Sequence, residues 1–264
     1  MDLQASAQMA HGHAVPGWAG GRGAVAGEAT PFGPGAYERG WTGTAVRADR
    51  PAYRAYKRAL DVLIAVVALT VFLMVLPLIA LAIKIDSPGP VFFMQDRVGM
   101  NRRRRARQRV EGERRKVLQP GRPIRIVKLR TMRTDAEKDG PRWAQKNDAR
   151  VTRVGKVLRK TRLDEVPQFA NVLAGQMSLI GPRPERLHFV RQLEQEIPQY
   201  HERLLVQPGI TGLAQVLNGY DEDTDSVRRK VELDRRYIQD CSVVQDLRIL
   251  LGTVRVVLKG EGAH

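Results

Sequence analysis

The sequence predicts an α+β fold, mostly helical with a small β element, that carries one amino-terminal re-entrant membrane helix hairpin and interfacial amphipathic helices. Three features indicate this class. They are an uncharged run of 22 residues from Val62 to Ile83, a stretch that alternates apolar and basic residues (123–132), and several segments with helical spacing. The chain has 264 residues, 43% of them apolar, which is enough to bury a core.

The composition limits the chemistry that the chain can perform. A single cysteine, Cys241, excludes an internal disulfide and a cysteine-based metal site. The formal net charge of +16 favours an anionic partner, and charge alone does not choose among nucleic acid, an anionic lipid surface and phosphorylated small molecules. Residues 1–52 are rich in Gly, Ala and Pro, show no secretory signal pattern, and predict a flexible arm.

The uncharged run predicts a membrane segment at residues 53–86, because a helix of this length matches the roughly 30 Å hydrocarbon core of a bilayer. Pro77 lies inside the run and would break or kink such a helix. Basic residues flank both ends, Lys57 and Arg58 before and Lys84 after, so neither end is marked as translocated. These observations favour a re-entrant hairpin broken at Pro77, with a single crossing and a buried soluble helix as the alternatives.

A densely basic insert follows at residues 101–122. Beside a membrane segment it predicts a strip that contacts anionic lipid, and a solvated loop is an equally good interpretation. A nucleic-acid surface would normally interleave aromatic side chains, and residues 101–116 have none, so no nucleic acid is expected as a partner.

The rest of the chain, residues 87–264, predicts one folded domain. It starts with a strand at 123–132, whose polar face would carry Arg125, Lys128 and Arg130 if a bulge interrupts the strict alternation. Helical spacing then predicts a helical region that Gly175 ends, a helix broken near Pro198, a charged helix, and an amphipathic interfacial helix at the carboxyl end (148–175, 186–206, 226–240 and 243–260).

Two adjacent acids, Asp164 and Glu165, are the first candidates for chemistry. Neighbouring residues on a helix point about 100° apart, so the two carboxylates can do different work. One can attack or accept a group while the other holds a hard divalent cation such as Mg²⁺. The alternative is structural, with Asp164 capping a helix that begins at Val166.

Basic residues stand near this pair in the sequence or on the preceding strand: Arg159, Lys160, Arg162, Lys128 and Arg130. Arginine forks and lysine ammonium groups bind phosphate oxygens, so a ring of cations around two acids suits a phosphate-handling site. Ordinary surface ion pairs are the alternative. Arg183 stands between two prolines, which would hold a tight loop and aim its side chain at one place. His188 and His201 are isolated and have no zinc-ligand spacing.

From about Tyr56 onward the sequence resembles the bacterial sugar transferases, the monotopic phosphoglycosyl transferases. The motifs that carry the resemblance are "KRALD", "SPGPVFFMQDRVG", "VKLRTM", "RVTRVGKVLRKTRLDEVPQFANVLAGQMSLIGPRP", "PGITGLAQV" and "DLRILLGTVRVVLKGEGA". Several long motifs in one order are more specific than any single pattern.

The resemblance implies an enzyme that moves a sugar 1-phosphate from a UDP-sugar to polyprenyl (undecaprenyl) phosphate and releases UMP, initiating exopolysaccharide or glycan synthesis. It implies that Asp164 is the nucleophile that forms a covalent phosphosugar intermediate and that Glu165 helps to hold Mg²⁺. It also implies phosphate or nucleotide contacts from Lys128, Arg159 and Arg183. The catalytic domain, residues 87–264, would lie on the cytoplasmic face of the inner membrane.

The sequence departs from the family pattern after residue 208. Leu213 stands where the family usually has Trp, and Tyr220 with neighbouring acids stands where Arg is common, so the sugar is left open. The polysaccharide pathway and association into a homo-oligomer are also left open. A function from another class is a noncatalytic membrane-anchored basic adaptor that binds anionic lipid or nucleic acid, which would not need Asp164 or Glu165.

Overall fold

The computed structural model describes residues 50–101, 121–138, 140, 148–218 and 224–259, all within one compact unit. The predicted arm lies almost wholly outside the described residues, and so does most of the basic insert. The predictions for both therefore stay predictions.

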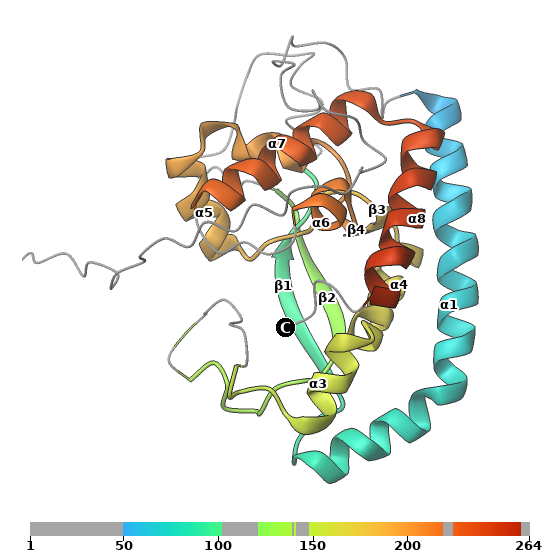
Figure 1. Cartoon of the computed structure of the whole chain (residues 1–264), viewed down its shortest axis with the longest axis vertical. Coiled ribbons are helices and arrows are strands. Elements are labelled where there is room, and N and C mark those ends of the chain that lie inside the picture. The colour runs from blue at the N-terminus through green and yellow to red at the C-terminus, as the bar shows by residue number, and fades with distance from the viewer. Residues whose placement is uncertain (1–49, 102–120, 139, 141–147, 219–223, 260–264) are drawn as a thin grey trace, which may run out of the picture. The chain divides into compact units, whose positions relative to one another are not determined.

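The described chain is mostly helical with two small sheets, as the sequence predicts (Figure 1). In chain order its elements, where η marks a 3₁₀ helix, are α1 (Pro51–Asp86), β1 (Phe92–Val98), β2 (Pro123–Leu129), α3 (Arg153–Lys160), η2 (Leu163–Gln168), α4 (Phe169–Leu173), β3 (Ser178–Ile180), α5 (Leu187–Glu196), η3 (Pro198–Leu205), β4 (Gly209–Thr211), α6 (Leu213–Leu217), α7 (Thr224–Asp240) and α8 (Val243–Lys259).

Helix α1 has 36 residues and contains the apolar run. It is long and apolar enough to cross a membrane, with a mean hydropathy of 3.1 over its best window. Only 11% of that window is buried, so α1 differs from the core helix of a soluble protein and indicates membrane association. The helix continues through Pro77 and bends toward its C-terminal end (Figure 1), so the predicted break is a bend within one helix. The return of the chain to one membrane face stays a prediction.

Polar contacts hold both ends of α1 against the rest of the domain. Near the start, Arg58 donates hydrogen bonds to the carbonyl oxygens of Val172 (2.6 Å) and Leu173 (2.7 Å) at the end of α4. Near the end, Asp86 Oδ2 accepts a hydrogen bond of 2.8 Å from the backbone N–H of Val154 in α3. Helix α1 is therefore tied to both helices that flank η2.

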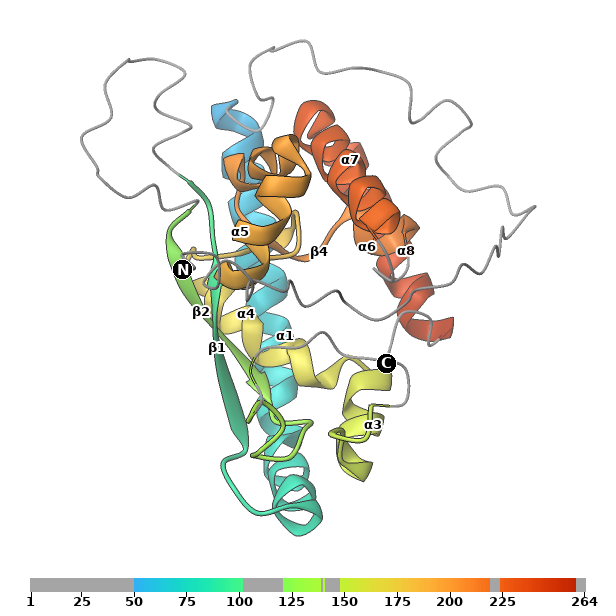
Figure 2. The ribbon, with the colours of Figure 1, turned by 90° about the vertical axis from the view of Figure 1, so that its left-hand side faces the viewer.

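Strands β1 and β2 form an antiparallel pair in which Phe93 lies opposite Lys128, and Figure 2 shows the two strands side by side. One face of β2 packs Ile124 and Ile126 against Ala65 of α1 in a buried apolar cluster. The predicted strand is correct but ends at Leu129, three residues early. After Leu129 the chain lies beside the segment between α1 and β1. There the backbone N–H of Arg130 donates a hydrogen bond to the Val91 carbonyl (2.8 Å).

A second, parallel sheet joins β3 and β4 and sets the loop that follows β3. Gly181 and Gly209 approach so closely that a Cβ added to Gly209 would lie 2.1 Å from the Gly181 nitrogen. The backbone N–H of Gly209 donates to the Pro182 carbonyl at 2.9 Å. This contact fixes the start of the loop that carries Arg183.

The carboxyl-terminal helices follow the sequence predictions closely. The chain breaks between α5 and η3 at Pro198, and Gly175, with φ of +67°, follows the end of α4. Helix α8 buries Asp246 and Ile249. Apolar side chains are exposed along the rest of this helix: Val243, Val244, Leu247, Leu251, Val254 and Leu258. The amphipathic pattern is therefore confirmed, and its interfacial role stays a prediction.

Candidate active site

One cavity of about 480 Å³ brings together all five predicted site residues. Asp164 and Glu165 come from η2, Lys128 from β2, Arg159 from α3, and Arg183 from the loop after β3. Strand β1 contributes Phe92 and Phe93 to the same cavity. A pocket of this volume lies within the range of about 300 to 1,000 Å³ that holds small-molecule ligands.

The local backbone explains how two adjacent acids reach this cavity. Helix α3 ends at Lys160, and Arg162 then adopts a left-handed conformation with φ of 59°. This residue reverses the chain into η2, whose first turn contains both Asp164 and Glu165. The predicted capping role of Asp164 is wrong, because the helix begins earlier: Arg162 is its N-cap residue and no side chain caps it.

Glu165 is held by two cations. Its Oε1 atom accepts hydrogen bonds from Lys128 Nζ at 3.0 Å and from Arg183 Nη2, and its Oε2 atom accepts one from Arg183 Nη1 at 3.3 Å. Burial alone would raise the pKa of Glu165, but Arg183 and Lys128 hold it well below its usual range. Glu165 is therefore a fixed carboxylate.

Asp164 lies beside this ion pair and is only 7% exposed. Its carboxylate has no hydrogen bond or ion pair with another residue in the part of the chain that the structure describes. Burial, and next the charge on Glu165, raise the pKa of Asp164 to about 6, against the opposing effect of the nearby cations. The two neighbours thus have opposite shifts, and Asp164 keeps its oxygens available to the cavity.

The surrounding cations are buried enough to act strongly. Burial lowers the pKa values of Lys128 and Arg159, whereas the charge of Glu165 raises the pKa of Arg183. Arg159 Nε donates to Thr131 Oγ1 at 2.9 Å, which fixes its guanidinium at the cavity. Such cations, oriented before a ligand arrives, suit phosphate oxygens.

Arg203 supports the loop that carries Arg183. Its side chain is 3% exposed and donates to Asp234 Oδ2 (2.6 Å), to Tyr200 Oη (2.6 Å) and to the backbone carbonyl of Arg183 (3.0 Å). The two prolines beside Arg183 and the buried Arg203 therefore together hold the loop that directs the Arg183 side chain into the cavity.

Arg97 and Glu185 also line the cavity, and the sequence analysis missed both. Arg97 Nη1 donates to Glu185 Oε2 at 3.1 Å, and Lys230 Nζ donates to Glu185 Oε1 at 2.9 Å. Although burial opposes the change, Lys230 and Arg97 lower the pKa of Glu185 to about 2. The sequence feature that could have identified Glu185 as a site residue is its position directly after "GPRP", the motif that contains Arg183.

Two basic residues predicted around the acids, Arg130 and Lys160, and Arg125 of the predicted strand face do not act on the acids. Arg130 reaches the cavity wall, but its guanidinium donates to the carbonyls of Ser87, Pro88 and Pro90. Arg125 pairs with Asp96 on the exposed face of the sheet. Lys160 is exposed and outside the cavity lining. The single polar face proposed for the strand is wrong, because β2 pairs with β1 residue by residue without the expected bulge and ends at Leu129. Arg125 and Lys128 are three positions apart and therefore lie on opposite faces of the sheet.

The donor set suits a hard cation that needs only one or two protein carboxylates. Among the described residues there is no group of three or more His, Cys, Asp and Glu side chains that could hold a metal. Glu165 has three of its roughly four lone-pair sites in use, so Oε2 keeps one, and Asp164 keeps all of its own. Mg²⁺ normally takes one or two carboxylates and completes its shell with water and substrate phosphate, so these residues fit it.

The fold and the site describe a membrane-associated protein with a cationic cavity around two unlike carboxylates, and comparison with known proteins gives its family. The family model of the bacterial sugar transferases matches residues 52–260, so the chain belongs to this family. This result confirms the resemblance seen in the sequence.

Three relatives show how far the similarity extends. A UDP-N-acetylgalactosamine-undecaprenyl-phosphate N-acetylgalactosaminephosphotransferase of Aeromonas hydrophila is 46% identical over 214 residues, which are 81% of this chain and 46% of the relative. A UDP-glucose:undecaprenyl-phosphate glucose-1-phosphate transferase of Caulobacter vibrioides is 41% identical over 219 residues, 81% of this chain and 74% of the relative. An exopolysaccharide production protein of Rhizobium leguminosarum is 39% identical over 213 residues, 78% of this chain and 97% of the relative. The chain thus spans less than half of the length of the Aeromonas relative.

Proposed function

We propose that this protein transfers a sugar 1-phosphate from a UDP-sugar to undecaprenyl phosphate and releases UMP, as the first step in building an exopolysaccharide or another glycan. Two relatives are named for such a reaction, and the cationic cavity suits a diphosphate. The observation that carries the proposal is the contrast between the two adjacent acids: Glu165 is neutralised by Lys128 and Arg183, whereas Asp164 is left without a partner among the described residues.

In the first step an oxygen of the Asp164 carboxylate attacks the phosphorus that bears the sugar. A new bond forms between this oxygen and phosphorus, and the bond from phosphorus to the bridging oxygen breaks, so that UMP leaves with the electron pair. Lys128, Arg159 and Arg183 offset the charge of the diphosphate, which allows an anionic nucleophile to approach. The product is a mixed anhydride between Asp164 and the sugar phosphate.

In the second step an oxygen of undecaprenyl phosphate attacks the same phosphorus. The new diphosphate bond forms as the bond to Asp164 breaks, which returns Asp164 to its carboxylate form. No other reactant is needed, because the acceptor phosphate supplies the nucleophile. The raised pKa makes the ionised Asp164 carboxylate a stronger nucleophile, but the protonated acid does not attack phosphorus, so the first step needs a pH above about 6.

We further propose that Glu165 contributes to binding of Mg²⁺ through its remaining lone pair. When bound, the ion would neutralise charge on the diphosphate. The chain's own residues act around it: Arg183 and Lys128 hold Glu165 in place, and the aspartate beside it stays directed at the substrate.

The membrane arrangement belongs to the same proposal. Residues 53–86 would enter the inner membrane as a re-entrant helix bent at Pro77, and residues 87–264 would form the catalytic domain on the cytoplasmic face. The bend within α1 and the exposed apolar stripe of α8 support this placement. A soluble sugar nucleotide and a lipid phosphate could then meet at one surface.

The test is a burst experiment with the purified full chain and a panel of UDP-sugars. Without acceptor, the wild type should release a single equivalent of UMP and gain the mass of one sugar phosphate on Asp164. Turnover should then start when undecaprenyl phosphate is added. Asp164→Asn should show neither event, whereas the matched control Asp96→Asn, at an exposed carboxylate outside the cavity, should show both.

Each outcome decides a different part of the proposal. A normal burst from Asp164→Asn would exclude Asp164 as the nucleophile. Absence of UMP release from every UDP-sugar by a correctly folded wild type would reject the transferase and favour the noncatalytic adaptor. The panel also identifies the sugar.

A further inference from the structure

A second cavity, of about 250 Å³, lies at the N-terminal turns of α1. It shares no lining residue with the cavity around Asp164. Its volume is below the range of about 300 to 1,000 Å³ typical of pockets for drug-sized ligands, so it suits a small group rather than a whole sugar nucleotide.

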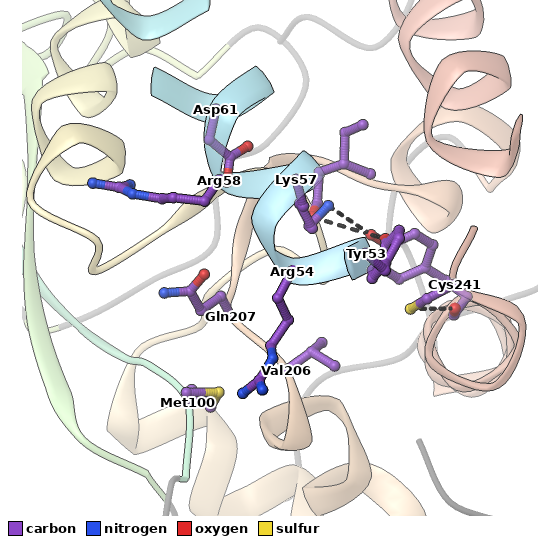
Figure 3. A pocket seen from close by; sticks show the side chains of 11 residues that line it. Tyr53, Arg54, Lys57, Arg58, Asp61, Met100, Val206, Gln207 and Cys241 are labelled. Atoms are coloured by element: carbon purple, nitrogen blue, oxygen red, sulfur yellow. Dashed lines mark hydrogen bonds between the residues drawn. The ribbon is translucent and has the colours of Figure 1, made fainter. Parts of the chain in front are cut away.

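The cavity has a cationic rim and a largely apolar floor (Figure 3). Arg54, Lys57 and Arg58 come from successive turns on one face of α1. The floor is formed by side chains from four other parts of the chain: Met100, Ile180, Val206 and Cys241. This combination suits an anionic group attached to an apolar body.

Two of the three cations are fixed by the protein. Arg58 points away from the cavity toward the α4 carbonyls, as Figure 3 shows. Lys57 Nζ donates to Tyr237 Oη at 3.0 Å and to Asp246 Oδ2 at 3.3 Å, which leaves one of its three N–H donors for another partner.

Arg54 is the cation that a ligand would engage. In Figure 3 its side chain extends from α1 toward Val206 and Met100, across the cavity. Among the described residues its guanidinium has no hydrogen bond or ion pair, and the residue is exposed. The one carboxylate in the lining, Asp61, accepts from Ser178 Oγ (3.1 Å) and from the Leu179 N–H (2.8 Å), so hydrogen bonds within the protein already hold it.

The position of the cavity indicates the source of the anion. Its α1 residues immediately precede the apolar run that begins at Val62, so they would lie at head-group depth if α1 enters a membrane. At the same end, Tyr53 Oη donates to Asp246 Oδ2 at 2.9 Å and thereby joins α1 to α8, whose first turns expose Val243 and Val244. The cavity therefore lies at the start of α1, and its lining includes Cys241, which stands two residues before α8 begins.

We propose that this cavity binds the phosphate head group of an anionic phospholipid through Arg54, with Lys57 as the second donor. The inference rests on the membrane placement of α1 but not on the transfer reaction. In the proposed transfer reaction the acceptor phosphate would enter the cavity that contains Asp164, so the lipid bound here would be a different molecule.

The test measures thermal unfolding of the purified full chain in neutral detergent micelles, titrated with short-chain phosphatidylglycerol, phosphatidylcholine or inorganic phosphate. For the wild type, phosphatidylglycerol should raise the unfolding midpoint in a saturable manner, and the other two additives should not. In Arg54→Gln the phosphatidylglycerol concentration for half of the shift should rise about tenfold, as expected for loss of a charge-assisted contact. The matched control Arg50→Gln removes an equal charge one helical turn away, outside the cavity, and should respond as the wild type does.

Equal responses of Arg54→Gln and Arg50→Gln would overturn the proposal, since the lipid would then act through general charge. An equal response to phosphatidylcholine would exclude selection of an anion, and an equal response to inorganic phosphate would exclude a lipid as the occupant. Asp164→Asn should keep the lipid response. A failure of the proposed transfer chemistry is therefore distinguishable from a failure of this site.

Discussion

Lys128 in β2 and Glu165 in η2 form a buried ion pair of 3.0 Å that joins the strand to the turn carrying Asp164. Their side chains are 16% and 10% exposed, so solvent screens the pair only weakly. The pair holds the Glu165 side chain in place, and the Lys128 ammonium group offsets the negative charge of Glu165 next to Asp164. The stability and the pH response of the site should both depend on it.

Asp164→Asn should make the protein more stable while it abolishes the covalent step. Burial raises the pKa of Asp164 to about 6, above its unfolded value, so ionised Asp164 opposes folding and the wild type loses stability as pH rises from 4 through 6. The variant lacks this penalty and should be more stable at pH 7.5 by about 1 to 3 kcal/mol. Thermal unfolding at pH 7.5 and pH 4 measures the effect, which should be nearly absent at pH 4. A variant that is less stable at pH 7.5 would contradict the buried and unpartnered state of Asp164.

Lys128→Met should shift the acidic limb of the rate profile to higher pH. Lys128 lowers the pKa values of both acids, so its removal should raise that of Asp164 and move the limb of the UMP burst rate upward by about one pH unit. The matched control Lys160→Met removes an exposed cation outside the cavity and should leave the limb near pH 6. Identical limbs in the two variants would show that Lys128 does not act on Asp164.

Glu165→Gln should cost stability and weaken the response to Mg²⁺. It leaves two buried cations without their carboxylate, at a cost of about 3 kcal/mol. The pKa of Glu165 is lowered, so its stabilisation is present above pH 4.5 and is lost as pH falls through the folded value; the gap to wild type should narrow in acid. Half-maximal UMP release should need roughly tenfold more Mg²⁺. An unchanged Mg²⁺ requirement would assign the ion to other residues.

The sequence predicted the site better than it predicted the support around the site. Asp164 and Glu165 are adjacent in the chain and Lys128 lies on the predicted strand, so local patterns made them candidates, and the family motifs that contain them indicated their roles. The contact between Arg203 and Asp234 spans 31 residues, and that between Arg97 and Glu185 spans 88. Such pairs leave no periodic signal, because tertiary packing alone brings them together.

Tertiary packing also explains why α1 stays helical through Pro77. Local chemistry predicts a break, since proline removes a hydrogen bond from the helix. In the structure Phe72 and Ile83, on opposite sides of Pro77, pack into one buried cluster with Leu129 and Leu158. Packing on both sides of the proline holds the helix together, so the helix continues through Pro77 instead of ending there.

Arg130→Lys should loosen the turn that leaves α1. Arg130 is 6% exposed, and its guanidinium donates to three carbonyl oxygens at 2.6 to 2.8 Å, a fork that an ammonium group does not reproduce. The expected loss is about 2 kcal/mol in the free energy of unfolding. The control Arg125→Lys, in an exposed pair with Asp96, should change stability by less than about 0.5 kcal/mol. Equal effects of the two substitutions would mean that the three carbonyl contacts contribute nothing.

A re-entrant α1 should place both of its flanks on one side of the membrane. Ala55 is exposed before the apolar run, and Asp96 is exposed on β1 after it. With Cys241 replaced by Ser, single cysteines introduced as Ala55→Cys and Asp96→Cys should react equally with a membrane-impermeant thiol reagent in inside-out vesicles, and neither should react in intact cells. The basic residues on both flanks and the bend in α1 lead to this expectation, because moving either flank across the bilayer would carry several positive charges with it. Labelling of the two positions from opposite sides would establish a single crossing.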